Sequence, residues 1–286
     1  MQEILEVLQD TAIDTIKLLP FLFITYLIME YIEHKTSNKA KDVIKKSGKF
    51  GPLLGAIVGV FPQCGFSVSA TNLYAGRVIT LGTLISVYLA TSDEMLPILL
   101  TEAVPAGTIF TILGIKLVLG IVAGFIIDFV IRMFRKEKVE EQEEKIEEIC
   151  EHEHCHCEEG IVTSAVKHTL NITIFIFFIT LVLNAIIAYI GEDTIAHFIS
   201  KNVILGPIVA GLIGLIPNCA SSVILTELFI SNVISMPVLI SGVAVNAGVG
   251  LLVLFKTNKN AKENLKIVGL LYIIGVLAGI ILELFI

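Results

Sequence analysis

Charged residues are scarce in this chain of 286 residues: Asp, Glu, Lys and Arg make up 16%, whereas 55% of the residues are hydrophobic and the mean hydropathy is +0.86. A water-soluble domain of this composition could not cover its surface with polar groups. The strict polar–apolar alternation of barrel strands is also missing, because the apolar runs are long and continuous. Backbone groups in lipid must be paired internally, so the sequence predicts an all-α polytopic membrane protein.

Three familiar signatures are missing as well. No G-x-x-x-x-G-K-[ST] motif is present, so the chain carries no ATP-hydrolysing engine of its own. No C-x-x-C pair is present, which is the usual spacing in thiol oxidoreductases. The first apolar run begins near Ala12 behind an acidic N-terminus and lacks the basic region and cleavage site of a signal peptide. We therefore expect this run to be the first membrane helix.

One segment is rich in charge. Residues 135–160 read RKEKVEEQEEKIEEICEHEHCHCEEG, and nothing in this connector could enter lipid. The connector divides the chain into a first membrane repeat, residues 1–134, and a second membrane repeat, residues 161–286.

The connector also holds a dense group of metal-binding residue types. Three cysteines and three histidines lie within eight residues, namely Cys150, His152, His154, Cys155, His156 and Cys157. Their spacing differs from that of a folded zinc finger and is typical of a flexible metal-binding tract. Thiolate and imidazole together favour zinc, copper or nickel. We expect an accessory metal site here; an acidic linker with chance Cys and His residues is the alternative.

The second repeat matches the first at a fixed offset of 155 residues, without a gap. Matches of Pro, Cys and Gly carry the argument, because apolar residues match by chance. They include Gly51-Pro52 with Gly206-Pro207, Pro62 with Pro217, Cys64 with Cys219, Gly120 with Gly275, and Ala123-Gly124 with Ala278-Gly279. The pattern predicts an internal duplication.

The distribution of basic residues predicts that the two repeats have opposite orientations. Six lysines lie in residues 35–49, whereas the counterpart, residues 189–205, has one lysine and two acids. The bias reverses later in each repeat, where residues 93–105 lack Lys and Arg but the counterpart ends in KTNKNAKENLK. Short cytoplasmic loops favour Lys and Arg, so we expect inverted-topology repeats of about five helical segments each. The connector would then lie in the cytoplasm and both termini outside the cytoplasmic (inner) membrane.

Each repeat contains a Pro-polar-Cys break within an apolar segment. Pro62 and Pro217 should bend or end their helices, and Gly65 adds freedom to the first break. Paired breaks in inverted repeats point to a substrate site near the midplane, so Cys64 and Cys219 are predicted to meet there as ligands of a soft ion. Possible neutral donors are Gln63, Ser67, Asn218, Ser221, Ser222 and Asn246. A kink with a packed thiol is the alternative, and residues 50–76 could be a re-entrant hairpin or one broken crossing.

Two acids and a lysine interrupt other apolar segments. Asp93 and Glu94 lie about midway through residues 78–104. Acids within a membrane often mark ion pathways or proton relays, so both are candidate ligands. A short external loop between two helices is the alternative. Lys116 lies within a long apolar run and is expected to snorkel or to pair with an acid.

With the motifs FPQCGFS, TSDE-x-LP and IPNCASS, the chain resembles the ten-transmembrane heavy-metal exporter family, whose members are called arsenic efflux proteins or manganese transporters. The resemblance covers essentially the whole chain. It implies a secondary permease that exports a metal or metalloid. It carries over to Pro62, Gln63, Cys64, Asp93, Glu94, Pro217, Asn218 and Cys219. Manganese would fit two thiols poorly.

These features together predict a transporter rather than an enzyme, one that exports a thiophilic heavy metal or metalloid and contacts membrane lipid. We expect no resident cofactor besides metal on the connector and no nucleic-acid partner; the sequence leaves the oligomeric state open. A membrane thiol oxidoreductase that uses Cys64 and Cys219 is one alternative function. A membrane protein that senses metal through its connector is another.

Overall fold

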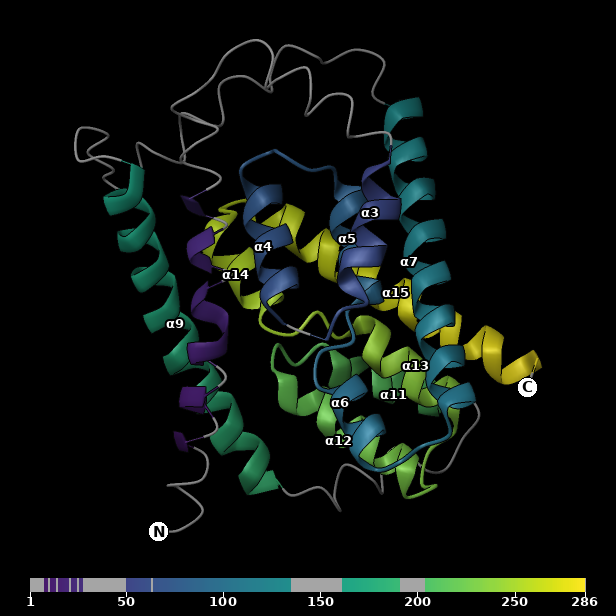
Figure 1. Ribbon diagram of the computed structural model, residues 1–286. Helices are drawn as coiled ribbons and strands as arrows, with labels where there is room; N and C mark the ends of the chain where they lie inside the picture. Colours follow the sequence, from purple (N-terminus) through teal and green to yellow (C-terminus); the bar gives the residue numbers. More distant parts are fainter. Residues whose placement is uncertain are drawn as a thin grey trace.

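The computed structural model describes residues 8–27 apart from positions 10, 14, 21 and 25, residues 50–134 apart from 63, and residues 161–190 and 204–285 (Figure 1). Every regular element within these ranges is a helix, which confirms the predicted all-α class. The first helix is described only in part, over residues 8–27.

After the first helix, the described ranges contain eleven helices in two series. The first series is α3 (Gly51–Gly59), α4 (Cys64–Ala75), α5 (Leu81–Ala90), α6 (Met95–Thr101) and α7 (Ala106–Phe134). The second series is α9 (Ile161–Ile190), α11 (Leu205–Gly214), α12 (Cys219–Ile230), α13 (Met236–Val245), α14 (Gly250–Thr257) and α15 (Ala261–Phe285).

The described residues include five helical stretches that are long and apolar enough to cross a membrane. Three are the single helices α7, α15 and most of α9, and two are the pairs α5–α6 and α13–α14. Large apolar side chains on α7 and α15 point outward, among them Phe110, Phe129 and Leu277. Such exposed apolar surface suits contact with lipid. The prediction of a multi-pass membrane protein is confirmed at this level.

The two series repeat one pattern of helix starts. The first residues of α4 and α12, of α5 and α13, of α6 and α14, and of α7 and α15 are each 155 positions apart, and those of α3 and α11 are 154 apart. Contacts repeat too: the Ser86 hydroxyl donates to the Pro52 carbonyl, and the Ser241 hydroxyl donates to the Pro207 carbonyl.

The two series interlock rather than lying side by side. Helix α4 packs against α14 of the other series, and α12 packs against α6 (Figure 1). Helices α5 and α13 also contact each other, and one apolar core mixes Leu84 and Tyr88 of α5 with Leu251 of α14 and Leu271 of α15. The four short helices α4, α6, α12 and α14 therefore surround the centre of the molecule.

The apolar segments that the sequence marks as interrupted are divided at those interruptions. Helices α3 and α4 have 9 and 12 residues. At 1.5 Å per residue each is far shorter than the roughly 30 Å hydrocarbon core of a bilayer. Helix α5 ends at Ala90 and α6 begins at Met95, so Asp93 and Glu94 lie in the connection between them.

Candidate metal site

The two predicted breaks place a cysteine at the start of a short helix. Cys64 is the first residue of α4, and Cys219 is the first residue of α12. Before α12, Asn218 takes an extended conformation and its side-chain oxygen accepts a hydrogen bond from the Ala220 amide. Asparagine is a favoured N-cap, so it explains locally why α12 begins at Cys219. Pro62 and Pro217 lie just before these helices, and Gly65 is the buried second residue of α4.

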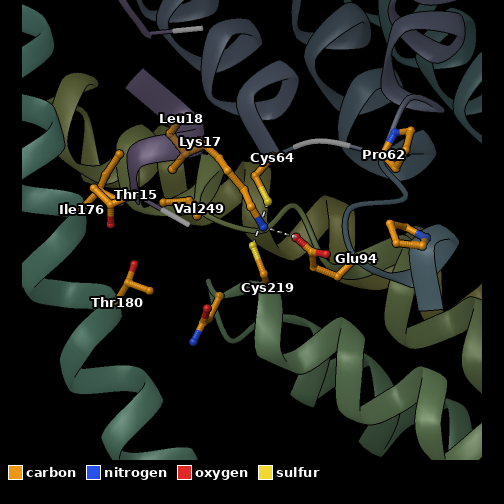
Figure 2. A pocket seen from close by; sticks show the side chains of 12 residues that line it. Thr15, Lys17, Leu18, Pro62, Cys64, Glu94, Ile176, Thr180, Cys219 and Val249 are labelled. Atoms are coloured by element: carbon orange, nitrogen blue, oxygen red, sulfur yellow. Dashed lines mark hydrogen bonds and ion pairs between the residues drawn. The ribbon is translucent and has the colours of Figure 1, made fainter. Parts of the chain in front are cut away.

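The two cysteine side chains meet. Their Sγ atoms lie 2.7 Å apart, and both side chains are buried (Figure 2). Metal–sulfur bonds are about 2.3 Å long, so one ion could contact both sulfurs after a small adjustment of the side chains. The N-termini of two short helices, α4 and α12, also converge at this point.

Asp93 completes a group of three. One carboxylate oxygen of Asp93 and the two sulfurs all lie within 4.8 Å of one another. The residue is 3% exposed, and neither carboxylate oxygen has a hydrogen-bond partner within the described part of the chain. A buried carboxylate without partners is costly unless a cation or proton compensates it. Asp93 therefore requires a positive charge or a proton close by, and it offers two free oxygen donors beside the thiols.

Glu94 has a different environment from Asp93. Its side chain is 34% exposed, and one carboxylate oxygen lies 4.0 Å from the Lys17 ammonium of the first helix. The neighbouring acids therefore separate, with Asp93 beside the thiols and Glu94 further out.

The backbone is unusual at Asp93 and at the equivalent position of the other repeat. Asp93 has φ +25°, and Gly248, 155 positions later, has φ +54°. A Cβ added at Gly248 would lie 2.6 Å from Asp93 Oδ2. Glycine at this position therefore makes room for the carboxylate and allows the left-handed turn.

Four of the predicted neutral donors, Ser67, Ser221, Ser222 and Asn246, take part in hydrogen bonds that stabilise the backbone of the site. The Ser67 and Ser222 hydroxyls donate to the carbonyls of Cys64 and Cys219, each at 2.8 Å. Asn246 ends α13, donates to the Ser221 hydroxyl and accepts a hydrogen bond from the Gly248 amide at 2.7 Å. These bonds hold the backbone at the two breaks. Gln63 lies outside the described residues.

A cavity of about 400 Å³ leads to the thiols (Figure 2). Its lining comes from the first helix, from α9, from the two breaks and from the starts of α6 and α14, namely Thr15, Lys17, Leu18, Pro62, Cys64, Glu94, Pro97, Ile176, Thr180, Asn218, Cys219 and Val249. The Thr180 hydroxyl is buried and has no hydrogen-bond partner among the described residues. The cavity therefore offers polar groups between the site and the edge of the helical assembly.

Lys116 corrects one expectation from the sequence. It does not snorkel: its side chain is 0% exposed, and its ammonium donates hydrogen bonds to the carbonyls of Thr91 and Val243 at 2.5 and 2.7 Å. It forms no ion pair with an acid within the described ranges. Sequence reasoning missed this role because the two carbonyls belong to other helices.

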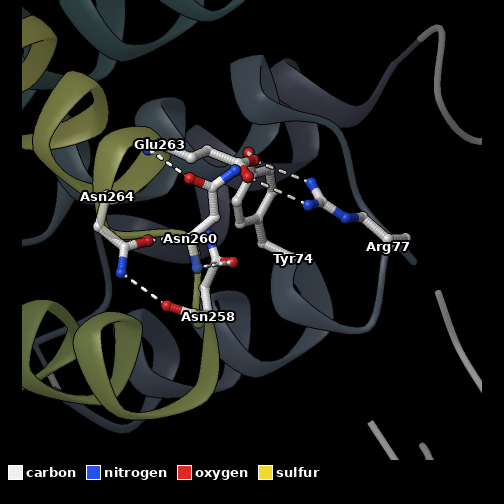
Figure 3. Close-up of polar contacts among 6 residues, drawn as sticks. All are labelled: Tyr74, Arg77, Asn258, Asn260, Glu263 and Asn264. Carbon is white, nitrogen blue, oxygen red and sulfur yellow. Dashed lines mark hydrogen bonds and ion pairs between the residues drawn. The ribbon is translucent and has the colours of Figure 1, made fainter. Parts of the chain in front are cut away.

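The sequence also gave no sign of a polar cluster that joins the two repeats at one end (Figure 3). Arg77, just after α4, forms two hydrogen bonds with Glu263 of α15, at 2.9 and 3.1 Å. The Tyr74 hydroxyl donates to the same carboxylate, and the Arg77 guanidinium lies over the Tyr74 ring. The Glu263 carboxylate raises the pKa of Arg77 above its usual value because it stabilises the charged form. We call these three residues the Tyr74–Arg77–Glu263 clamp.

The connector cluster, Cys150, His152, His154, Cys155, His156 and Cys157, lies outside the described residues. Its predicted metal binding stays a prediction.

Comparison with known proteins finds a matching family model. No curated protein and no solved structure matches the chain. A family model described as "Putative, 10TM heavy-metal exporter" matches residues 2–169, more than half of the 286 residues. The match includes Cys64, Asp93 and Glu94, and the resemblance seen in the sequence is confirmed. The multi-pass chain that holds these residues therefore belongs to this ten-transmembrane heavy-metal exporter family.

Proposed function

We propose that the protein is a secondary transporter that exports a thiophilic heavy metal or metalloid ion across the cytoplasmic membrane. The observation that carries this proposal is the group of Cys64, Cys219 and Asp93, whose ligand atoms lie within 4.8 Å of one another at two helix breaks. Membership of a heavy-metal exporter family supports the same class of function.

The donor set indicates which ions the site would prefer. Two sulfurs favour soft or borderline ions such as zinc, cadmium, copper(I) and trivalent arsenic. Manganese prefers oxygen donors, and Asp93 is the one carboxylate of the group, so manganese is a poor fit. A dication would displace one proton from each thiol and leave a neutral dithiolate complex beside Asp93.

The interlocked helices support an arrangement of inverted repeats. Exchanging the two series exchanges the α4–α14 contact with the α12–α6 contact, and it leaves the Cys64–Cys219 contact in place. A pseudo-twofold axis that passes between the two sulfurs would produce this exchange. The short helices α3, α4, α11 and α12 would then be half-crossings that meet at the midplane, as re-entrant segments do.

The loop charges orient this arrangement in the membrane. The six lysines of residues 35–49 and the basic start of the connector favour the cytoplasm. The C-terminal end of α7 and the N-terminal end of α9 adjoin the connector, so they mark the cytoplasmic end (Figure 1). Both chain termini would lie outside.

The structure would then represent a state closed to the cytoplasm. Thr80, three residues after Arg77, donates a hydrogen bond to Asp128 near the cytoplasmic end of α7, so the Tyr74–Arg77–Glu263 clamp lies at that end. The cavity is lined by Thr15 and Lys17 of the first helix and by Thr180 of α9, which lie toward the other end. Opening of the clamp and closure of the cavity would expose the thiols to the cytoplasm, as alternating access requires.

Uptake of metal into inside-out vesicles tests the proposal. Cadmium, zinc, manganese and arsenite would be offered to wild type, Cys64→Ser and Cys219→Ser, with Cys155→Ser as a matched control outside the membrane. Accumulation of a thiophilic ion that fails in both membrane variants and persists in the control supports the site. Normal transport by both Cys64→Ser and Cys219→Ser would rule it out.

The 2.7 Å contact between the sulfurs also favours a second function, a membrane thiol oxidoreductase. Oxidation would join the two sulfurs and pass two electrons and two protons to a membrane quinone. The two functions respond differently to a strong reductant: a metal permease stays active when its thiols are kept reduced. An oxidoreductase would instead reduce quinone without any metal, and both cysteine variants would stop that reaction.

A further inference from the structure

Lys116 is a buried charge that the proposed transport site does not use as a ligand. Three charged side chains are buried in the described part of the chain: Asp93, Lys116 and Asp128. Asp128 accepts hydrogen bonds from the Thr80 hydroxyl and the Gly82 amide, so its charge is satisfied locally. Within the described ranges neither Asp93 nor Lys116 forms a direct ion pair, although Lys116 donates hydrogen bonds to two backbone carbonyls. An uncompensated buried charge is expensive, so the two charges need an explanation together.

The position of the Lys116 ammonium is set by two helix ends. Thr91 is the C-cap of α5, and Val243 lies in the last turn of α13. Carbonyls in the last turn of a helix lack intrahelical partners and carry the negative end of the helix dipole. The two hydrogen bonds therefore hold a positive ammonium where one helix of each repeat ends.

These contacts bring the ammonium close to the metal site. Thr91 is two residues before Asp93, and the Asp93 carboxylate lies close enough to attract the ammonium. The two groups thus balance each other electrostatically while the carboxylate stays directed at Cys64 and Cys219.

The internal repeat gives an independent reason to treat the two charges as a pair. The position equivalent to Asp93 is Gly248, and the position equivalent to Lys116 is the fully buried Leu271. The first repeat therefore has both charges at these positions and the second repeat has neither. A lysine that served only to cap the helix ends would be equally useful in both repeats.

We propose that Lys116 is the resident counter-cation of the Cys64–Cys219–Asp93 site. The assignment of that site to metal transport rests on the proposed function, whereas the pairing of the two charges does not. When no cargo is bound, Lys116 balances Asp93 and lets the carboxylate remain buried and charged. When a dication binds to the two thiolates, Lys116 and Asp93 continue to cancel, so the loaded site is neutral. Lys116 also repels the cargo, and this repulsion favours its release.

A double-mutant cycle on the full-length protein, reduced and free of metal, tests the pairing. Thermal unfolding would be measured for wild type, Asp93→Asn, Lys116→Met and the double variant. Each single variant leaves one buried charge without its counter-charge, so each should unfold at a lower temperature. The double variant removes both charges and should be more stable than Lys116→Met alone.

The control for this cycle combines Lys116→Met with Asp128→Asn, because Asp128 has its own hydrogen-bond partners. The losses of stability caused by Lys116→Met and by Asp128→Asn should add in the double variant. If the Asp93 and Lys116 losses also add, or if neither Lys116→Met nor the double variant folds, then Lys116 only caps helix ends and the inference is wrong.

Cadmium binding, followed by thiolate-to-cadmium absorbance, tests the effect on cargo. Lys116→Met removes a positive charge near the cargo, so it should bind cadmium roughly tenfold more tightly than wild type does. Unchanged or weaker binding by a folded Lys116→Met would overturn this part. If wild type binds no cadmium, the proposed transport site fails while the stability cycle still decides the pairing of the charges.

Discussion

Arg77 and Glu263, which are 186 residues apart in the chain, bind each other through two parallel hydrogen bonds and join the two repeats. A bidentate ion pair between a guanidinium and a carboxylate is strong and directional. Helix α4 begins with Cys64 at the candidate metal site and ends just before this ion pair. The ion pair therefore restrains the helix that any opening on that side would have to move.

Arg77→Asn should loosen the Tyr74–Arg77–Glu263 clamp without straining the backbone. Arg77 has φ +59°, and Asn232 already occupies the equivalent position with φ +58°. We expect a loss of about 1 kcal/mol in stability from the half-buried ion pair. We also expect faster modification of Cys64 by a membrane-impermeant thiol reagent added on the cytoplasmic side. Tyr272→Phe, which removes a hydroxyl from α15 outside the clamp, serves as a control. Equal labelling rates in wild type and Arg77→Asn would show that this ion pair does not control access.

Asp93→Asn and Glu94→Gln should have different effects on metal binding. Asp93 is directed at the two sulfurs, so loss of its charge should weaken cadmium binding tenfold or more, by a Coulomb term of roughly 1.4 kcal/mol. Glu94 is partly exposed beside Lys17, and screening by solvent should limit the effect of Glu94→Gln to about twofold. Isothermal titration of the purified protein with cadmium measures both. Similar losses in the two variants would contradict the separation of these acids.

Gly248→Ala should damage the site by steric conflict. Its Cβ would lie 2.6 Å from Asp93 Oδ2, and its φ of +54° adds strain of about 1 kcal/mol for a residue with a side chain. We expect weaker cadmium binding and a lower unfolding temperature. Gly114→Ala is the matched control, because nothing lies within 4 Å of its added Cβ in the middle of α7. If both alanine variants bind cadmium like wild type, the carboxylate does not depend on Gly248 for its place.

Deletion of residues 150–157 separates an accessory connector from a sensing one. A tract that only collects metal matters when metal is scarce, so the deletion should raise the metal concentration for half-maximal transport and leave the maximal rate unchanged. Transport by vesicles over a range of zinc concentrations measures both quantities. A deletion variant that no longer functions at any concentration, while Cys64→Ser still does, would favour the sensor hypothesis instead.

The sequence predicted the parts of this site that depend on the repeat. The fixed offset pairs Cys64 with Cys219, and prolines before both residues explain why α4 and α12 begin there. The offset carries no information on contacts between positions that are not equivalent. Arg77 and Glu263 correspond to Asn232 and Thr108 in the other repeat, so nothing in the pattern could pair them.

The two intramembrane acids show a second limit of the sequence. Asp93 and Glu94 are adjacent and chemically alike, and the turn between α5 and α6 decides which one is buried. That turn depends on how the α5 end packs against α7 and on the glycine at position 248. A lysine in an apolar run likewise resembles a snorkelling residue until the helix ends that receive its ammonium are known.

The contact between Asp93 and Gly248 limits how this protein can have arisen. The Asp93 side chain occupies the space that a side chain at the equivalent position, Gly248, would need. In an assembly of two identical halves, both positions would be acidic, and two carboxylates would compete for one place on the symmetry axis. The single acid therefore requires the halves to differ. Fusion of the two copies into one chain, followed by divergence, provides such halves, because each copy can then change alone.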